Sequence, residues 1–191
     1  MTTGRLEAFT DAVIAIVITI LVLELRVPHE PELAALSGVV PVFLTYVLSF
    51  VYLGIYWNNH HHMMVLTERV NGKILWANLH LLFWLSLVPF TTAWMGETDF
   101  AASPTAVYGV DLLLAAIAYF ILQTAIIAEE GPDSRLRAAL GRDLKGKISP
   151  LLYFAAIPLA FVSPWIALAV YVSVALMWLV PDRRIESAVS E

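Results

Sequence analysis

The sequence predicts an all-α membrane protein with six transmembrane helices and both termini on the cytoplasmic side. Of its 191 residues, 60% are hydrophobic and only 14% are charged, and the mean hydropathy is +0.78. Soluble domains are typically about a quarter charged, and a soluble fold of this size could not bury so much apolar surface. A lipid bilayer can solvate that surface instead, so we expect the chain to cross a membrane several times.

Breaks at polar residues and prolines divide the apolar sequence into candidate spans. A spanning helix needs about 20 predominantly apolar residues. The predicted spans cover residues 10–27, 40–62, 74–95, 105–128, 149–162 and 164–180. The last apolar stretch, 148–180, is too long for one span, and Ser163-Pro164 interrupts it, so we expect two short helices there. These spans leave no room for a separate soluble domain, and residues 1–191 are predicted to form a single six-helix domain.

The basic residues indicate the orientation of these spans. Six spans with cytoplasmic termini place ten of the eleven Lys and Arg residues on one side, with Arg26 as the exception. This matches the general excess of basic residues in cytoplasmic loops. A single span over 148–180 would put Arg183 and Arg184 on the opposite side. The polar segment 129–147 is read either as a short amphipathic helix at the inner surface or as a solvated loop.

Several functional classes find no support in the sequence. There is no cysteine for a disulfide, a thiolate metal site or a cysteine nucleophile, and the net charge of −5 argues against nucleic-acid binding. HExxH, GxSxG and phosphate-loop motifs are absent from the sequence. The adjacent histidines His60-His61-His62 would point in different directions on a helix and make a poor metal site. We therefore expect no enzyme, no cofactor and no nucleic-acid partner.

The first predicted span is preceded by an unusual group of polar and aromatic residues. Arg5, Phe9 and Asp11 come before an apolar run from Ala12 to Leu23. Charged side chains at the membrane edge are costly unless they are paired. Chemistry alone leaves two interpretations open: an N-terminal cap made by Thr10 or Asp11, with an arginine that extends to the membrane surface, or a functional network.

This segment resembles the Arg-x-x-x-Phe-Ser-Asp signature of the transmembrane protein 175 family, the lysosomal and prokaryotic potassium channels. Further stretches that look like its prokaryotic members are the run Ala12 to Leu23, Tyr56-Trp57-x-x-His60-His61, and Asn78-Leu79 before Pro89-Phe90. The resemblance covers nearly the whole chain. Thr10 stands where the family usually has serine, so the hydroxyl is kept and a methyl group is added.

The resemblance implies a homotetramer of six-helix subunits in which helix 1 lines a central pore with a hydrophobic constriction. By position after the signature, the pore-lining residues are Ile16, Thr19, Ile20 and Leu23. Four copies of Ile16 and Leu23 would form apolar rings able to gate by dewetting, and Thr19 could offer hydroxyls to a partly dehydrated ion. The residues alone favour a different interpretation of these positions, as ordinary lipid-facing or packing residues, because every face of this helix is apolar.

The signature itself is expected to hold helix 1 against neighbouring helices and subunits. By the same resemblance, this structural network contains Arg5, Phe9, Thr10 and Asp11, with Trp57, His61 and Asn78 as their expected partners.

The expected function is therefore a potassium channel that conducts passively in the cell membrane. Its partners would be further copies of itself, lipid and monovalent cations, with potassium as the permeant ion and no other metal. An alternative is a secondary transporter or proton-coupled permease, in which Glu24, His80 and Asp111 would form an intramembrane relay. A non-conducting membrane scaffold is a third possibility.

Overall fold

The computed structural model describes residues 2–141 and 143–179, which form an all-α fold without strands. The long helices are α1 (Thr3–Leu23), α2 (Val40–Val65), α3 (Gly72–Glu97), α4 (Ala102–Glu130), α6 (Leu144–Leu159) and α7 (Pro164–Leu179). Shorter elements are the 3-10 helices η1 (Leu33–Val39) and η2 (Gly131–Asp133) and the helix α5 (Arg135–Leu140). The end of the sixth predicted span at Val180 and the basic residues Arg142, Arg183 and Arg184 lie outside the described residues.

Within residues 2–141 and 143–179, four helical segments are long and apolar enough to cross a membrane. They are α1, the continuous segment Leu33–Val65, α3, and the segment Ala102–Asp133. Both α6 and α7 have 16 residues. At a rise of 1.5 Å per residue such a helix is about 24 Å long, somewhat less than the hydrocarbon core of a typical bilayer.

Helix α1 differs from its predicted boundaries at both ends. It begins at Thr3 rather than at residue 10, because hydropathy marks the lipid-embedded part of a helix and not the polar turns before it. It ends at Leu23 rather than at 27, and Val27 precedes Pro28, a position that disfavours helical backbone. Thr10 and Asp11 consequently lie inside the helix, so the interpretation of these residues as an N-terminal cap was wrong.

The predicted break in the last apolar stretch is present. Helix α6 ends at Leu159 and α7 begins with Pro164, where the fixed φ of proline suits a first helical turn. The start of α6 lies earlier than the predicted residue 149, because the Asp143 side chain accepts a hydrogen bond from the Gly146 amide and caps the helix. The short helix α5, with Leu136 buried, lies in the polar segment where one was considered.

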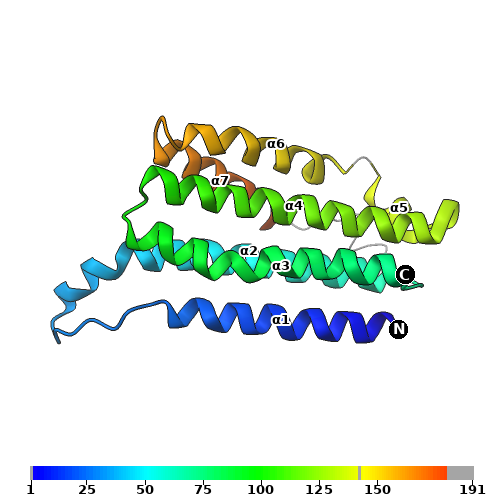
Figure 1. The fold of residues 1–191 in the computed structure, drawn as a ribbon, viewed down its shortest axis with the longest axis horizontal. Coiled ribbons are helices and arrows are strands. Elements are labelled where there is room, and N and C mark those ends of the chain that lie inside the picture. Colours follow the sequence, from blue (N-terminus) through cyan, green and yellow to red (C-terminus); the bar gives the residue numbers. More distant parts are fainter. Residues whose placement is uncertain (1, 142, 180–191) are drawn as a thin grey trace.

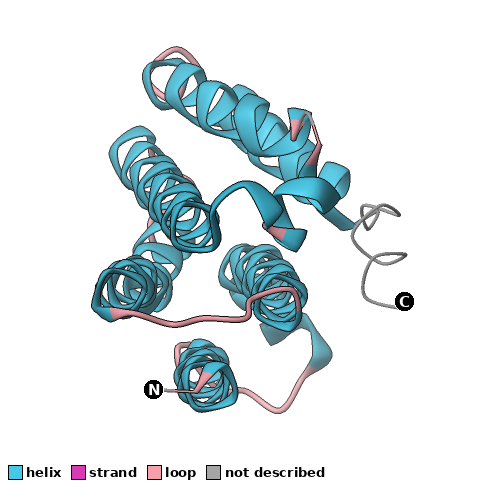
Figure 2. Cartoon of the chain, turned by 90° about the vertical axis from the view of Figure 1, so that its right-hand side faces the viewer, coloured by secondary structure: helices cyan, strands magenta, loops and turns pink. Residues whose placement is uncertain are grey.

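The helices form two adjoining packing units. Figure 1 shows α1 at one edge, α2 and α3 beside it, then α4, and the α6–α7 pair at the opposite edge. One hydrophobic core lies among α1 to α5, and a second lies among α2, α4, α6 and α7 with Met95 of α3. Viewed from the end in Figure 2, α1 is a peripheral helix that packs on α2 and α3. One side of α1 is therefore left uncovered by the other residues that the structure describes.

Candidate functional site

The two faces of α1 differ in burial although both are largely apolar. Residues three or four positions apart lie on one face of a helix. The face packed against α2 and α3 carries Leu6, Thr10, Ile14, Val17 and Leu21. On the uncovered side, Ile16 is 58% exposed, Ile20 is 40% exposed and Leu23 is 78% exposed. These three residues are thus available to contact lipid or another copy of the chain.

Thr19 is also exposed and lies on the same side as Ile16 and Ile20. Its hydroxyl donates a hydrogen bond of 2.7 Å to the backbone carbonyl of Ile16. That bond uses the hydroxyl proton and leaves oxygen lone pairs to accept from a donor or to contact a cation. Thr19 is therefore the polar acceptor within an otherwise apolar stripe of Ile16, Ile20 and Leu23, which we call the α1 stripe.

The buried face of α1 is tied to the bundle by three polar side chains from three helices. The Asn78 amide of α3 donates to the Thr10 hydroxyl over 2.9 Å. The Asn78 side-chain oxygen lies 2.9 Å from Nε2 of His60 on α2. Thr10 and Asn78 have no exposed surface and His60 is only 1% exposed. This chain of hydrogen bonds fixes the position of α1 relative to α2 and α3 from inside the core.

Two further contacts join α1 to α2 nearer the surface. The indole N–H of Trp57 donates to the Asp11 carboxylate over 3.0 Å. Nδ1 of His61 lies 2.6 Å from a carboxylate oxygen of Glu7, which forms an ion pair when the histidine is protonated. Along α2, Trp57 and His61 are four positions apart and so lie on one face, opposite Asp11 and Glu7 of α1.

The structure brings together part of the expected network and adds residues that the sequence did not indicate. Asn78 and Trp57 contact the signature residues Thr10 and Asp11, whereas His61 contacts Glu7. Glu7 and His60 were not among the expected network residues, and only the helical spacing of Glu7 before Asp11 could have suggested a shared face. Arg5 and Phe9 are exposed on the uncovered side of α1, and their side chains make no hydrogen bond or ring contact with a described residue.

Two residues of the alternative relay, His80 and Asp111, lie in separate hydrogen-bonded pairs. Nε2 of His80 accepts from the Trp84 indole over 2.9 Å, on the exposed side of α3. Asp111 is buried and accepts from the Thr91 hydroxyl over 3.0 Å. No hydrogen bond links Glu24, His80 and Asp111 to one another. Among the described residues, no group of three or more His, Asp or Glu side chains is placed to hold a metal ion.

Comparison with known proteins identifies relatives over the whole chain. Residues 5–89 match the family described as the endosomal/lysosomal potassium channel TMEM175. The chain is 53% identical over 191 residues to a protein named as a potassium channel in Chryseobacterium sp. (strain P1-3), with 100% of both chains covered. It is 32% identical to a potassium channel of Streptomyces collinus, over 92% of this chain and 90% of the relative.

A solved structure has the same fold. The crystal structure of a lysosomal potassium-selective channel TMEM175 homolog from Chamaesiphon minutus matches with a TM-score of 0.81 and 30% sequence identity. The match covers 94% of this chain and 97% of that one. Family membership is established by the relative that is 53% identical over the full length and by the agreement in fold. The chain belongs to the TMEM175 family.

Proposed function

We propose that the protein is a potassium channel that conducts passively through a pore formed by several copies of the chain. The support comes from membership of the TMEM175 family and from relatives named as potassium channels, one of them 53% identical over the whole length. The fold is that of a potassium-selective family member. Because ion channels catalyse no covalent reaction, the protein is not an enzyme.

The observation that carries the pore assignment is the uncovered stripe on a peripheral helix. The α1 stripe is apolar and exposed in the single chain, while the opposite face of α1 is packed and hydrogen-bonded to α2 and α3. A helix held rigidly on one side can present its other side to an axis of symmetry. We propose a homotetramer in which the four α1 helices surround the permeation path.

In this arrangement the α1 stripe forms the constriction. Rings of Ile16, Ile20 and Leu23 would make a narrow apolar passage that blocks ions when it loses water and conducts when it is hydrated. Thr19 lies between these rings and presents hydroxyl oxygens whose protons are directed to the Ile16 carbonyl. A partly dehydrated potassium ion would meet oxygen acceptors at this level.

We further propose that each subunit crosses the cell membrane six times, with both termini in the cytoplasm. Four helical segments in the described part of the chain have the length and composition of membrane spans. The α6–α7 pair, with a turn between Leu159 and Pro164, would supply two shorter spans. This topology keeps the basic residues, Arg26 excepted, on one side. Conduction in this scheme requires no cofactor.

A secondary transporter is a weaker candidate for this chain. A proton relay needs groups joined by hydrogen bonds or by bridging water, and His80 and Asp111 are instead paired with Trp84 and Thr91. Those hydrogen bonds account for the presence of His80 and Asp111 in the apolar helices without a role in transport.

Flux through purified protein in liposomes tests the proposal. The full-length protein is reconstituted with an outward potassium gradient, and efflux is measured with potassium, and then with sodium, as the internal cation. A channel gives efflux that is fast, grows in proportion to the driving force and prefers potassium. Saturable flux that requires an opposing proton gradient would identify a transporter, and liposomes no leakier than empty ones would identify a scaffold.

A further inference from the structure

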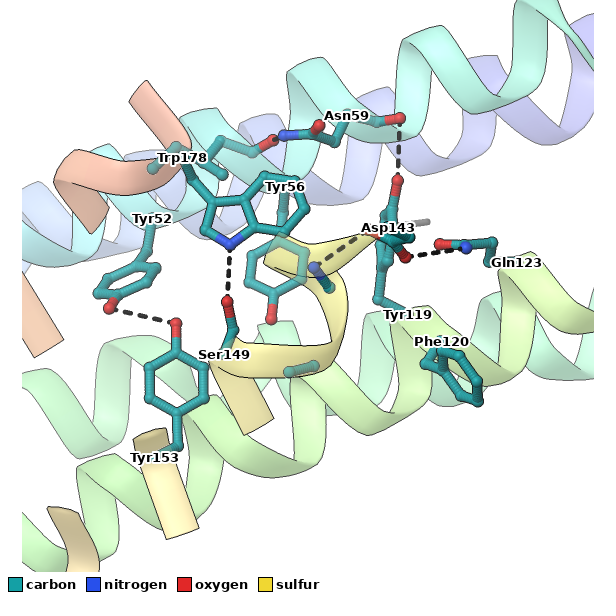
Figure 3. Close-up of a pocket in the computed structure, with 13 residues that line it drawn as sticks. Tyr52, Tyr56, Asn59, Tyr119, Phe120, Gln123, Asp143, Ser149, Tyr153 and Trp178 are labelled. Carbon is teal, nitrogen blue, oxygen red and sulfur yellow. Dashed lines mark hydrogen bonds between the residues drawn. The ribbon is translucent and has the colours of Figure 1, made fainter. Parts of the chain in front are cut away.

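A second polar feature lies far from the α1 stripe, in the core among α2, α4, α6 and α7. There a partly open cavity of about 50 Å³ lies between the helices (Figure 3). Six aromatic rings contribute to its wall: Tyr52, Tyr56, Tyr119, Phe120, Tyr153 and Trp178. The wall contains no residue of α1 and none of the side chains that hydrogen-bond α1 to the bundle. This cavity is therefore unexplained by the proposed pore.

The polar hydrogens around the cavity are largely committed to other groups of the protein, among them the backbone carbonyls of Tyr171 and Lys145, which lie outside its wall. The Tyr119 hydroxyl donates to the backbone carbonyl of Asn59 over 3.1 Å. The Trp178 indole donates to the Ser149 hydroxyl over 2.9 Å. The side chains whose donors are used in this way are Tyr52, Tyr119, Ser149, Tyr153 and Trp178. A molecule bound in the cavity would find few N–H or O–H donors for its own hydrogen-bond acceptors.

The acceptors of the wall remain available. The Asp143 carboxylate accepts one hydrogen bond on each oxygen, from the Gln123 amide over 3.2 Å and from the Gly146 backbone over 3.0 Å. Each of these oxygens keeps a further acceptor site. The side-chain oxygens of Asn59 and Gln123 accept no hydrogen bond from a described residue. The cavity thus combines unused oxygen acceptors with one negative charge.

The aromatic rings also favour a positively charged ligand. The face of an aromatic ring is electron-rich and attracts cations, most strongly for tryptophan. In this structure the Lys145 ammonium already lies 5.9 Å from the centroid of the Trp178 ring. Acceptor oxygens, a carboxylate and aromatic faces together indicate a cation that carries both N–H donors and an apolar part. A bare potassium ion has neither, since it needs a shell of oxygens.

We propose that this cavity binds a small ammonium group, either of a free alkylamine or of the ethanolamine headgroup of a lipid. The volume of about 50 Å³ compares with the roughly 10–15 Å³ that one water requires, so the cavity admits a group of a few heavy atoms. The site is separate from the proposed permeation path and adds a ligand-binding function to it.

Methylammonium is the probe for the first test. The full-length protein, purified in detergent, is titrated with methylammonium chloride at constant ionic strength, and binding is followed by calorimetry. We expect saturable binding that weakens roughly tenfold in Asp143→Asn, the range expected for losing one charge contact in a partly desolvated site. Asparagine tolerates the left-handed backbone at this position, where φ is 39°, and can still cap α6.

Two further variants separate a site from a general charge effect. Tyr56→Leu should weaken binding several-fold by removing an aromatic face, whereas Asp133→Asn, which removes an exposed carboxylate outside the cavity, should leave affinity unchanged. Equal weakening by Asp133→Asn, absence of saturable binding, or displacement of methylammonium by potassium at equal concentration would each overturn the proposal.

Nanodiscs distinguish the two sources of the ammonium group. The apparent affinity for methylammonium is compared in discs of phosphatidylglycerol alone and in discs that also contain phosphatidylethanolamine. Competition that appears only with phosphatidylethanolamine supports a lipid headgroup as the occupant. Equal affinity in both discs supports a free amine.

Discussion

The side-chain amide of Asn78 donates a hydrogen bond to the hydroxyl of Thr10 over 2.9 Å at a point with no exposed surface. The same amide group faces His60 with its oxygen, so a single residue of α3 connects α1 to α2. Leaving one buried polar group without its partner costs more than the hydrogen bond itself contributes. The position of the helix proposed to line the pore therefore depends on all three side chains.

Replacing Thr10 by valine tests this dependence. Valine has nearly the same shape but no hydroxyl, so an N–H of Asn78 is left without its acceptor in the core. We expect a loss of about 1–3 kcal/mol in stability, seen as a lower unfolding temperature in detergent. Thr10→Ser, which keeps the hydroxyl, is the matched control and should cost about 1 kcal/mol or less. Equal melting of the two variants would mean that the hydrogen bond contributes little.

The Trp57–Asp11 contact makes a different prediction because it lies nearer the surface. Asp11→Ala and Trp57→Phe each remove one partner of the 3.0 Å hydrogen bond. A double-mutant cycle on stability should give a coupling energy of about 0.5–1.5 kcal/mol. In liposomes, both variants should reduce flux by impairing assembly or gating, while the potassium preference of the remaining flux stays the same. A changed preference would place these residues in the permeation path instead.

Much of the fold could be predicted from the positions of prolines and the length of apolar runs. Pro164 correctly marked the start of α7, and the spans assigned to α2 and α3 agree with the helices to within three residues at each end. The start of α1 was missed because Thr3–Phe9 is too polar to register as a span. It nevertheless contains no proline, and Gly4 lies in the first turn, where it does not prevent helix formation.

The burial of individual residues on α1 could not be predicted in the same way. Ile14 is 1% exposed and Ile16 is 58% exposed, although they are chemically identical and only two positions apart. A periodic pattern identifies the buried face of a helix only where the other face is polar. The run from Ala12 to Leu23 contains a single polar residue, Thr19. The pairing of Glu7 with His61 was missed for a related reason, since contacts between helices depend on their relative rotation, which a single sequence does not specify.

The close approach of α2 and α3 at Gly96 predicts a strong effect of a single methyl group. A Cβ atom at this position would lie 2.8 Å from Cα of Val42 and 2.6 Å from the Thr45 hydroxyl. Because Val42 Cα belongs to a helix backbone, it cannot move away without displacing α2. Gly96→Ala should therefore lower stability by about 1–3 kcal/mol, measured by thermal unfolding. Gly72→Ala, where nothing lies within 4 Å, should be neutral or slightly stabilising.

The last prediction compares the same substitution on the two faces of α1. Ile16→Asn places an amide on the exposed α1 stripe, where a hydrated pore can solvate it, so we expect normal assembly with altered conductance and a severalfold lower preference for potassium over sodium. Ile14→Asn places the same amide in the core without a partner and should reduce the yield of folded protein. Size-exclusion chromatography and liposome flux measure the two outcomes. If Ile16→Asn assembles normally and conducts like the unmodified protein, the α1 stripe does not line the pore.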